Sequence, residues 1–404
     1  MAAHPQRADA ARGKVELAQV FARHGAAYQA AHRLATVQYR ALRAIEACRT
    51  EALGGHVERC EACGLLRYHY HSCRNRHCPK CQSLAKERWL AARRAELLPV
   101  AYFHLVFTLP HELNAAAQGN PRTIYTLLFQ SVSDTLIEFG ANPRWLGGAI
   151  AATLVLHTWG QTLSQHLHLH CLIAAGALGA DGRWIRPRRG FLFPVKALSP
   201  VFRGKFLAGL KRAFDAGRLR LEGSTLALTK PAPRSAFFAQ LYAQPWVVYA
   251  KAPFGGPQQV LDYLGRYTHR VALSNNRLVS VNDTEVRLRY KDYAHGNARK
   301  VLALPPAEFI RRFLLHVLPA GFMRIRHYGL IANRTKRAKL AAARAALDHP
   351  PAAQAQQPES VEAFWLRVVK LDIHQCAHCH AGRMRVIGPI MPALARAPPL
   401  PRQT

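Results

Sequence analysis

The most restrictive feature of this sequence is a dense run of cysteines near its N-terminal end. Five of the nine cysteines lie between Cys60 and Cys81, where they include two Cys-x2-Cys pairs separated by fourteen residues. Each pair can present two thiolates to one ion, and two pairs complete a tetrahedron around Zn²⁺. The spacing therefore predicts a structural zinc site made by Cys60, Cys63, Cys78 and Cys81.

Other residues of the same segment leave the ligand set open and indicate its role. Cys73 and His77 lie inside it, and either can replace one of the four thiolates. Arg74, Arg76 and Lys80 lie there as well. A closed four-ligand site leaves no position for a reacting group, and clustered cationic side chains are typical of nucleic-acid binding. We therefore predict that the module recognises nucleic acid and does not itself catalyse a reaction.

A third Cys-x2-Cys pair, Cys376 and Cys379, lies near the C-terminal end. It supplies half of a four-ligand set, which His374, His378 or His380 can complete. The pattern alone leaves metal binding and free cysteines equally open. The odd number of cysteines and the lack of an apolar export signal argue against a disulfide framework and predict a reducing cytoplasm.

Charge is the second indication of function. The chain holds 56 Lys and Arg against 23 Asp and Glu, a formal net charge of +33, although 50% of its residues are hydrophobic. A chain with so much apolar material folds, so the charge belongs to the surfaces of folded domains. Such surfaces indicate a polyanionic partner, because each neutralised phosphate releases counterions. A ribosome-like or membrane-surface binder is the alternative, and no apolar stretch is long enough to predict a membrane span.

Hydrophobic periodicity and breaker residues predict an α+β fold. The N-terminal part is helical, whereas the centre mixes antiparallel hairpins with helices instead of alternating βαβ units. Strands are expected at 102–108, 149–158, 167–174, 246–251, 276–280 and 285–290, and helices at 15–52, 86–98, 123–139, 201–216, 257–267 and 306–318. No Walker A motif and no Gly-x-Gly-x-x-Gly after a strand is present, so nucleotide hydrolysis has no support.

The same patterns predict the order of the domains. A helical and zinc-binding DNA-recognition domain (1–98) precedes an antiparallel-sheet core (99–300). A basic helical extension (301–340), a linker rich in Ala, Gln and Pro (341–360) and a small tail with the third cysteine pair (361–404) follow.

Three histidines alternate along one of the expected strands. His166, His168 and His170 are separated by Leu167 and Leu169. Because side chains of a strand alternate between its faces, the imidazoles share one face and the leucines the other. A polar sheet face with incidental histidines is the alternative. The strict alternation with apolar residues favours a divalent-metal site with open positions, which can polarise a scissile phosphate.

Two tyrosines follow at helical spacing. Tyr263 and Tyr267 are four residues apart and share one face of the expected helix. Taken alone, this spacing is more typical of two packed aromatic positions. Arg266 and Arg270 make the face polar, however, and a tyrosine phenolate is a competent nucleophile for phosphoryl transfer. Gly265 costs a helix about 1 kcal/mol relative to Ala, which indicates close approach by another segment.

These motifs together resemble a known family. A metal-binding His-hydrophobic-His motif followed by a Tyr-x3-Tyr helix is typical of the HUH single-strand nucleases with two tyrosines. Segments similar to those of IS91-type transposases occur in the order found in that family: Ser72–Gln82, Tyr263–Arg270, Arg289–Tyr293, Glu308–Pro319 and Arg324–Gly329. The likeness covers residues 15–335 and recurs in the C-terminal tail.

The resemblance implies a rolling-circle transposase, a bacterial cytoplasmic protein associated with the nucleoid, with its HUH nuclease domain at 99–300. Tyr263 or Tyr267 would attack one DNA strand, leaving a 5′-phosphotyrosine link and a free 3′-OH. The other tyrosine would resolve the transfer after replication, and Tyr267, beside Arg270, is the more favoured first nucleophile. A variant in which only one tyrosine reacts is an alternative. Arg266 and Arg270 would contact the DNA.

The resemblance also implies cofactors and partners. His168 and His170 match the two motif histidines, and His166, His157 or Gln161 would supply the third ligand to Mg²⁺ or Mn²⁺, while zinc is structural. The partners would be single-stranded DNA, the ends of the mobile element and the host replication machinery, with no membrane. Two other functions fit the same residues: a non-catalytic zinc-dependent DNA-binding protein, and a plasmid or phage rolling-circle replication initiator.

Overall fold

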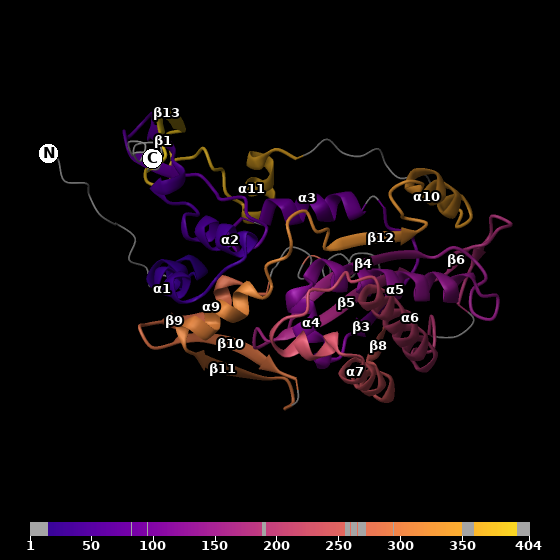
Figure 1. Cartoon of the computed structure of the whole chain (residues 1–404). Helices are drawn as coiled ribbons and strands as arrows, with labels where there is room; N and C mark the ends of the chain where they lie inside the picture. The colour runs from indigo at the N-terminus through magenta and orange to yellow at the C-terminus, as the bar shows by residue number, and fades with distance from the viewer. Residues whose placement is uncertain are drawn as a thin grey trace, which may run out of the picture.

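The computed structural model describes residues 15–81, 83–94, 96–187, 191–254, 259, 265, 272–293, 295–349 and 359–393. Its centre is a five-stranded antiparallel sheet in the order β12-β4-β5-β3-β8. The strands are β3 (Tyr102–Thr108), β4 (Ala151–Trp159), β5 (Gln165–Ala174), β8 (Val248–Phe254) and β12 (Ile325–Gly329). The mixed architecture with antiparallel sheets confirms the α+β class (Figure 1).

One face of the central sheet is apolar and covered by helices. Leu105 and Phe107 on β3 and Leu167 and Leu169 on β5 point into the largest hydrophobic core of the chain. The ring of Phe107 meets Phe202 edge-on, with centroids 5.2 Å apart. Figure 1 shows the helices that cover this face: α5 (Pro121–Ala141), α6 (Val195–Asp215) and α7 (Pro231–Ala243). The short helix α4 (Asn114–Gly119) packs beside α5.

The opposite face is apolar at one end only. There Tyr102 and Leu172 pack with Leu98 and with Leu340 of α10 (Lys336–Ala345), and Trp89 of α3 (Ser83–Arg94) packs against them. The other end of this face carries the histidines. The small ribbon β6 (Ala177–Leu178) with β7 (Trp184–Ile185) extends from the hairpin beyond β5.

A second packed unit joins segments that lie far apart in sequence. The ring of Phe21 in the N-terminal helices meets Phe313 edge-on, with centroids 5.5 Å apart, within a core of its own. Its elements are α1 (Leu17–Ala31), α2 (Thr36–Glu46), β9 (Leu278–Val281), β10 (Val286–Asp292), β11 (Ala298–Leu304) and α9 (Pro306–Leu314). The single helical stretch expected at 15–52 is therefore wrong, because the chain leaves the helix at 32–35. The expected second hairpin gains a third strand, β11.

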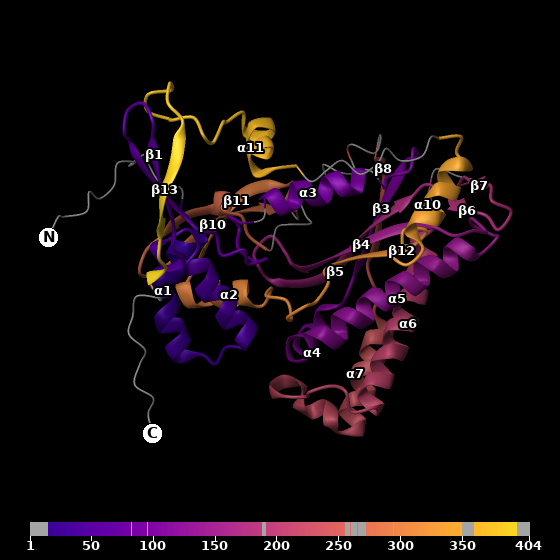
Figure 2. The same ribbon diagram turned by 90° about the horizontal axis from the view of Figure 1, so that it is seen from above.

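A third sheet pairs a hairpin of the N-terminal region with a strand near the C-terminal end. Its order is β13 (Met384–Ile390), β1 (Gly55–Cys60) and β2 (Leu66–Tyr70), all antiparallel. Figure 2 shows β13 beside β1, and α11 (Val361–Val369) lies on the path toward it. The polar, cysteine-rich segment thus contains a hairpin that its composition did not predict. Across the described part of the chain, no helix is long and apolar enough to cross a membrane.

Candidate metal centres and active site

The central sheet brings three histidines together on its polar face. His168 on β5 lies directly opposite His157 on β4, and His170 is two residues further along β5. One ring nitrogen from each lies within 4.8 Å of the others. The antiparallel register therefore assembles a three-imidazole group from two neighbouring strands.

Hydrogen bonds orient these rings. His168 Nδ1 lies 2.9 Å from the carbonyl oxygen of His166, so this nitrogen donates and Nε2 keeps its lone pair. That Nε2 faces Nε2 of His170 at 3.1 Å. On its other side, His170 Nδ1 lies 2.9 Å from Nε2 of His104 on β3. Metal-binding imidazoles are commonly held by a hydrogen bond at the second ring nitrogen, and the backbone bond of His168 is of this kind.

Burial keeps these imidazoles neutral. It lowers the pKa of His168 to about 3 and that of His104 to about 4, and it lowers the pKa of His170 well below its usual value. A neutral imidazole is the form that binds metal. At neutral pH His168 and His170 therefore offer lone pairs to a cation without first losing protons.

The structure separates the three alternatives for the third position. His157 completes the group, and its ring stacks on Trp159 with centroids 4.6 Å apart. His166 is not a member of the group, although its ring lies 4.8 Å from that of His168 and 5.7 Å from that of His111. Gln161 is directed toward the hydroxyl of Tyr293, to which its amide donates at 3.3 Å. The sequence named His157 only as an alternative, because the register of two strands is not visible in either one.

His104 is the residue of this centre that the sequence did not single out. It lies opposite Leu172 of β5, and its ring stacks on that of His170 with centroids 5.1 Å apart. The signal was its place in the expected strand 102–108, which alternates with the apolar Phe103 and Leu105.

Both tyrosines, with Arg266 and Arg270, lie outside the described residues. Gly265, between them in sequence, is described as helical and buried. A Cβ atom at Gly265 would lie 2.8 Å from Cδ1 of Leu90 in α3, so a side chain there would require the Leu90 side chain to shift. The close approach predicted for this glycine is confirmed.

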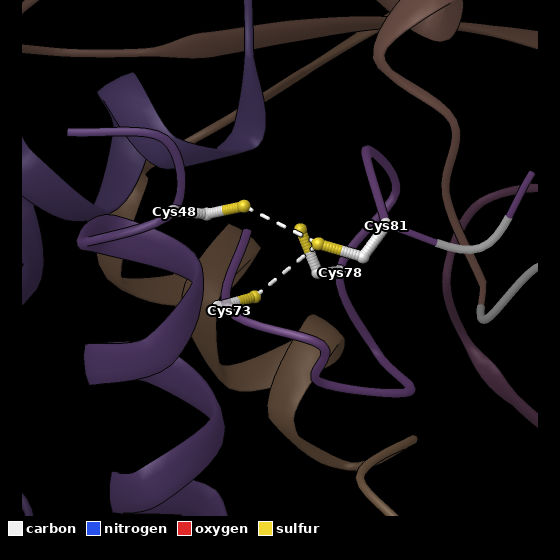
Figure 3. Close-up of side chains that lie close together, drawn as sticks. All are labelled: Cys48, Cys73, Cys78 and Cys81. Atoms are coloured by element: carbon white, nitrogen blue, oxygen red, sulfur yellow. Dashed lines mark hydrogen bonds between the residues drawn. The ribbon is translucent and has the colours of Figure 1, made fainter. Parts of the chain in front are cut away.

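A four-cysteine cluster lies where α2, the loop after β2 and the loop before α3 meet. Its members are Cys48, Cys73, Cys78 and Cys81, whose sulfurs all lie within 4.8 Å of one another. Figure 3 shows them converging, with Sγ of Cys81 3.3 Å from that of Cys48 and 3.6 Å from that of Cys73. Cys48 and Cys78 are buried in the second core. Four thiols in this arrangement suit tetrahedral zinc.

The predicted grouping of Cys60 and Cys63 with Cys78 and Cys81 is therefore wrong in its geometry. Cys60 and Cys63 lie at the tip of the β1–β2 hairpin, whereas His71 and Gly54 pair at its base. A six-residue strand spans about 20 Å, so tip and base cannot share an ion. Cys48, which belongs to no Cys-x2-Cys pair, takes part at the base.

The other residues predicted to act in this module lie in different environments. His77 is buried and accepts a hydrogen bond from the backbone N–H of Leu318 at 3.1 Å, so it serves as an internal contact outside the cluster. Arg76 donates to the carbonyl of Phe322 at 2.7 Å, and Lys80 forms an ion pair with Glu16 at 2.5 Å. Arg74 is exposed. Of the three predicted DNA-contacting cations, Arg74 presents its charge to solvent most openly. 

A second four-cysteine cluster involves the tail. Its members are Cys60, Cys63, Cys376 and Cys379, with sulfurs within 4.8 Å of one another. The histidines considered as partners of the third pair are not members.

Comparison with known proteins agrees with these features. Residues 151–339 match the family described as a putative transposase, and residues 20–109 match the transposase zinc-binding domain. A putative transposase of Sinorhizobium fredii, y4qJ, is 49% identical over 381 residues, which cover 93% of this chain and 96% of that protein. The transposase for insertion sequence element IS801 of Pseudomonas savastanoi pv. phaseolicola is 29% identical over 301 residues, covering 71% of this chain and 68% of that protein.

A chain with this zinc-binding domain and this histidine-bearing sheet is a transposase. It belongs to the IS91-type transposase family, as the sequence motifs led us to expect. The zinc-binding match contains the first cysteine cluster, and the putative transposase match contains His157, His168 and His170 as well as both tyrosines. Cys376 and Cys379 lie beyond both matches.

Proposed function

We propose that this protein carries out rolling-circle DNA transposition, by metal-dependent cleavage and rejoining of single DNA strands through a 5′-phosphotyrosine intermediate. The observation that supports this most is the group of imidazoles of His157, His168 and His170 in a chain of the transposase family. Three imidazole ligands leave coordination positions for substrate oxygens, as catalytic sites require and closed structural sites do not.

The donor set fits a divalent cation. It contains nitrogen atoms and no carboxylate among the described members, so it suits a transition-metal ion better than Mg²⁺, which prefers oxygen ligands. When bound, such an ion supplies Lewis acidity toward a phosphate oxygen. His166 and His104 hold the rings of His168 and His170 in place through the hydrogen bonds at their Nδ1 atoms.

The nucleophile in this proposal is Tyr263 or Tyr267. The phenolate oxygen forms a bond to phosphorus while the bond from phosphorus to the 3′-oxygen breaks, and the departing 3′-oxygen takes up a proton. The phosphotyrosine keeps the energy of the broken bond, so rejoining needs no ATP. The other tyrosine then accepts or transfers the second strand.

DNA binding is assigned to the basic surfaces and to the zinc module. The net charge of +33 favours a nucleic-acid partner, and the exposed Arg74 lies beside the first cysteine cluster. Arg266 and Arg270 flank the tyrosines in sequence. In this proposal, these residues bind the ends of the mobile element as single strands. The host replication machinery then extends the freed 3′-OH.

The test is formation of a covalent adduct. The protein is incubated with labelled single-stranded DNA carrying the element's end, with Mn²⁺, with Mg²⁺ or with EDTA, and resolved under denaturing conditions. We expect a metal-dependent adduct that Tyr263→Phe and Tyr267→Phe each reduce and the double variant abolishes. Tyr242→Phe, at an exposed position of α7, is the matched control and should leave the adduct unchanged.

The outcome also decides between functions. No adduct under any metal condition, with tight DNA binding intact, would show a non-catalytic zinc-dependent DNA-binding protein. An adduct that persists in the double tyrosine variant would show that neither tyrosine is the nucleophile, although the protein would still cleave DNA.

A further inference from the structure

We propose that Cys60, Cys63, Cys376 and Cys379 bind a second structural zinc ion, which fastens the C-terminal segment to the N-terminal hairpin. The zinc-binding domain match ends before Cys376 and Cys379, so it assigns no such site. The inference rests on the geometry of the four cysteines and is independent of the strand-transfer chemistry.

The sulfur positions match those around a tetrahedral zinc ion. Zinc–sulfur bonds of about 2.3 Å place the sulfurs of a tetrahedral site about 3.8 Å apart. Sγ of Cys63 lies 3.8 Å from that of Cys376, and Sγ of Cys60 lies 3.6 Å from that of Cys379. A disulfide would require about 2.05 Å, so these pairs have the spacing of co-ligands.

In each Cys-x2-Cys turn, one sulfur accepts a hydrogen bond from the backbone N–H three residues further on. In the first, the backbone N–H of Cys63 donates to Sγ of Cys60 at 3.5 Å. In the second, the N–H of Gly382 donates to Sγ of Cys379 at 3.4 Å. Hydrogen bonds from backbone N–H groups stabilise thiolates, the form that binds metal. Each turn thus presents a pair of oriented sulfurs to the same point.

The approach of the two turns depends on a glycine. A Cβ atom at Gly382 would overlap Sγ of Cys60 and would lie 2.7 Å from Cβ of Ala62. The N–H of Glu61 also donates to the carbonyl of Arg383 at 3.0 Å, next to that glycine. The chain is therefore shaped for close contact between turns that lie more than 300 residues apart in sequence.

The surrounding sheet needs such a cross-link. Among the described residues, the buried cluster of this lobe consists of Cys60, Cys376 and Met384, with Cys379 packed against it. Apolar side chains such as Tyr68 and Val386 face solvent instead, 54% and 63% exposed. A small sheet that buries so little apolar surface is stable only with a metal or a covalent link. The four thiols at its centre supply the metal link.

The experiment replaces zinc by Co²⁺ in the full-length protein and records the thiolate-to-Co²⁺ charge-transfer band. This band reports thiolate-bound metal alone, so ions at the histidines do not contribute. We expect an intensity equivalent to two four-thiolate sites per chain. The Cys376→Ser/Cys379→Ser variant should keep half of it, and Cys73→Ser/Cys81→Ser should keep the other half. His378→Ala and His380→Ala are matched controls in the same turn and should keep all of it.

Other results of the same experiment would contradict the proposed zinc site. An intensity equal to one site in the wild type, unchanged by Cys376→Ser/Cys379→Ser, would overturn the proposal. So would loss of thiol titre at these four cysteines in the denatured, metal-free protein, because it would show disulfides. Should the serine variant fail to fold, Cys376→His keeps a ligand and should shift the Co²⁺ band without halving the bound metal; an unshifted spectrum would exclude Cys376 as a ligand.

Discussion

The central and peripheral sheets both carry candidate metal ligands, yet they differ in what stabilises them. One face of the central sheet packs against α5, α6 and α7 in the largest core of the chain. The peripheral sheet of β13, β1 and β2 encloses little beyond its own cysteines and Met384. In the central sheet, the packed core positions the histidines. In the peripheral sheet, the cysteines and their proposed zinc ion stabilise the fold.

This difference follows from the origin of the ligands. His157, His168 and His170 come from two strands joined by a short turn, so ordinary strand pairing brings them together. The peripheral cluster joins the hairpin tip at Cys60 to the tail at Cys376, and such a long loop loses much entropy on closure. A metal ion that binds both ends offsets this loss.

The largest expected effect is that of metal removal. Structural zinc sites contribute on the order of 10 kcal/mol to folding of the segment that they close. Chelation should therefore open the peripheral sheet and leave the central sheet folded. Hydrogen exchange is the measurement: amides of Gly55–Tyr70 and Met384–Ile390 should lose protection, while those of β4 and β5 keep it. Equal loss in both sheets would contradict the distinction.

The second prediction concerns the central sheet, which we expect to depend on its apolar core and not on zinc. Phe107→Ala removes a fully buried ring from the central core and should lower the free energy of unfolding by about 3–5 kcal/mol without loss of bound zinc. Tyr68→Ala, at an exposed position of the peripheral sheet, is the control and should change it by about 0.5 kcal/mol or less. Denaturant unfolding gives both values. A larger change at Tyr68 than at Phe107 would mean that the apolar core of the central sheet is not its main support.

The third effect concerns activity. Loss of one ligand from a Lewis-acid site costs about 3 kcal/mol of transition-state stabilisation, roughly a hundredfold in rate. His170→Ala should therefore reduce metal-dependent strand cleavage by about that factor while the protein stays folded. His166→Ala, four positions earlier on the same face of β5, should reduce it less than about tenfold. Comparable losses in both variants would restore His166 as the third ligand in place of His157.

The sequence predicted the central sheet well and the ligand sets poorly. The strand expected at 102–108 coincides with β3, and the hairpin expected at 149–174 contains β4 and β5. These strands have strong local alternation, which a single sequence displays directly. The strands β1, β2, β12 and β13 were not predicted. They are short and partly polar, and β12 and β13 owe their structure to pairing with distant segments.

The cysteine assignment failed for the same reason. Spacing identified Cys78 and Cys81 as ligands but could not show that Cys48, at the end of a helix, lies beside them. It also could not pair Cys60 with Cys379, since that contact depends on the fold of the whole chain. Local patterns name ligand types, whereas long-range packing decides which of them share an ion.

The fourth effect is the pH dependence of stability, and it concerns two buried histidines that contact the central sheet or its turn. His316 donates from Nε2 to the carbonyl of Leu163 and accepts from the hydroxyl of Thr158 at Nδ1, so it is neutral. Nε2 of His327 on β12 accepts from Arg93 at 2.8 Å. Burial lowers the pKa of both histidines to about 4.

The sign of the effect follows from these values. The unfolded chain binds protons at these two histidines near pH 6.5, whereas the folded chain does so only near pH 4. The free energy of unfolding should therefore be constant above about pH 7 and fall as the pH drops from about 6.5 toward 4. His316 alone should account for about 2–3 kcal/mol of that loss. Urea midpoints at pH 8, 6 and 5 measure it.

A matched variant tests the assignment to His316. His316→Gln can keep both hydrogen bonds but does not titrate, so its stability should fall less steeply between pH 6.5 and 5 even if it starts lower. An equally steep fall in the variant would place the titrating groups elsewhere. Because Thr158 lies on β4 and Leu163 lies in the turn that joins β4 to β5, a confirmed effect would show that neutral His316 fastens this turn to the segment after α9.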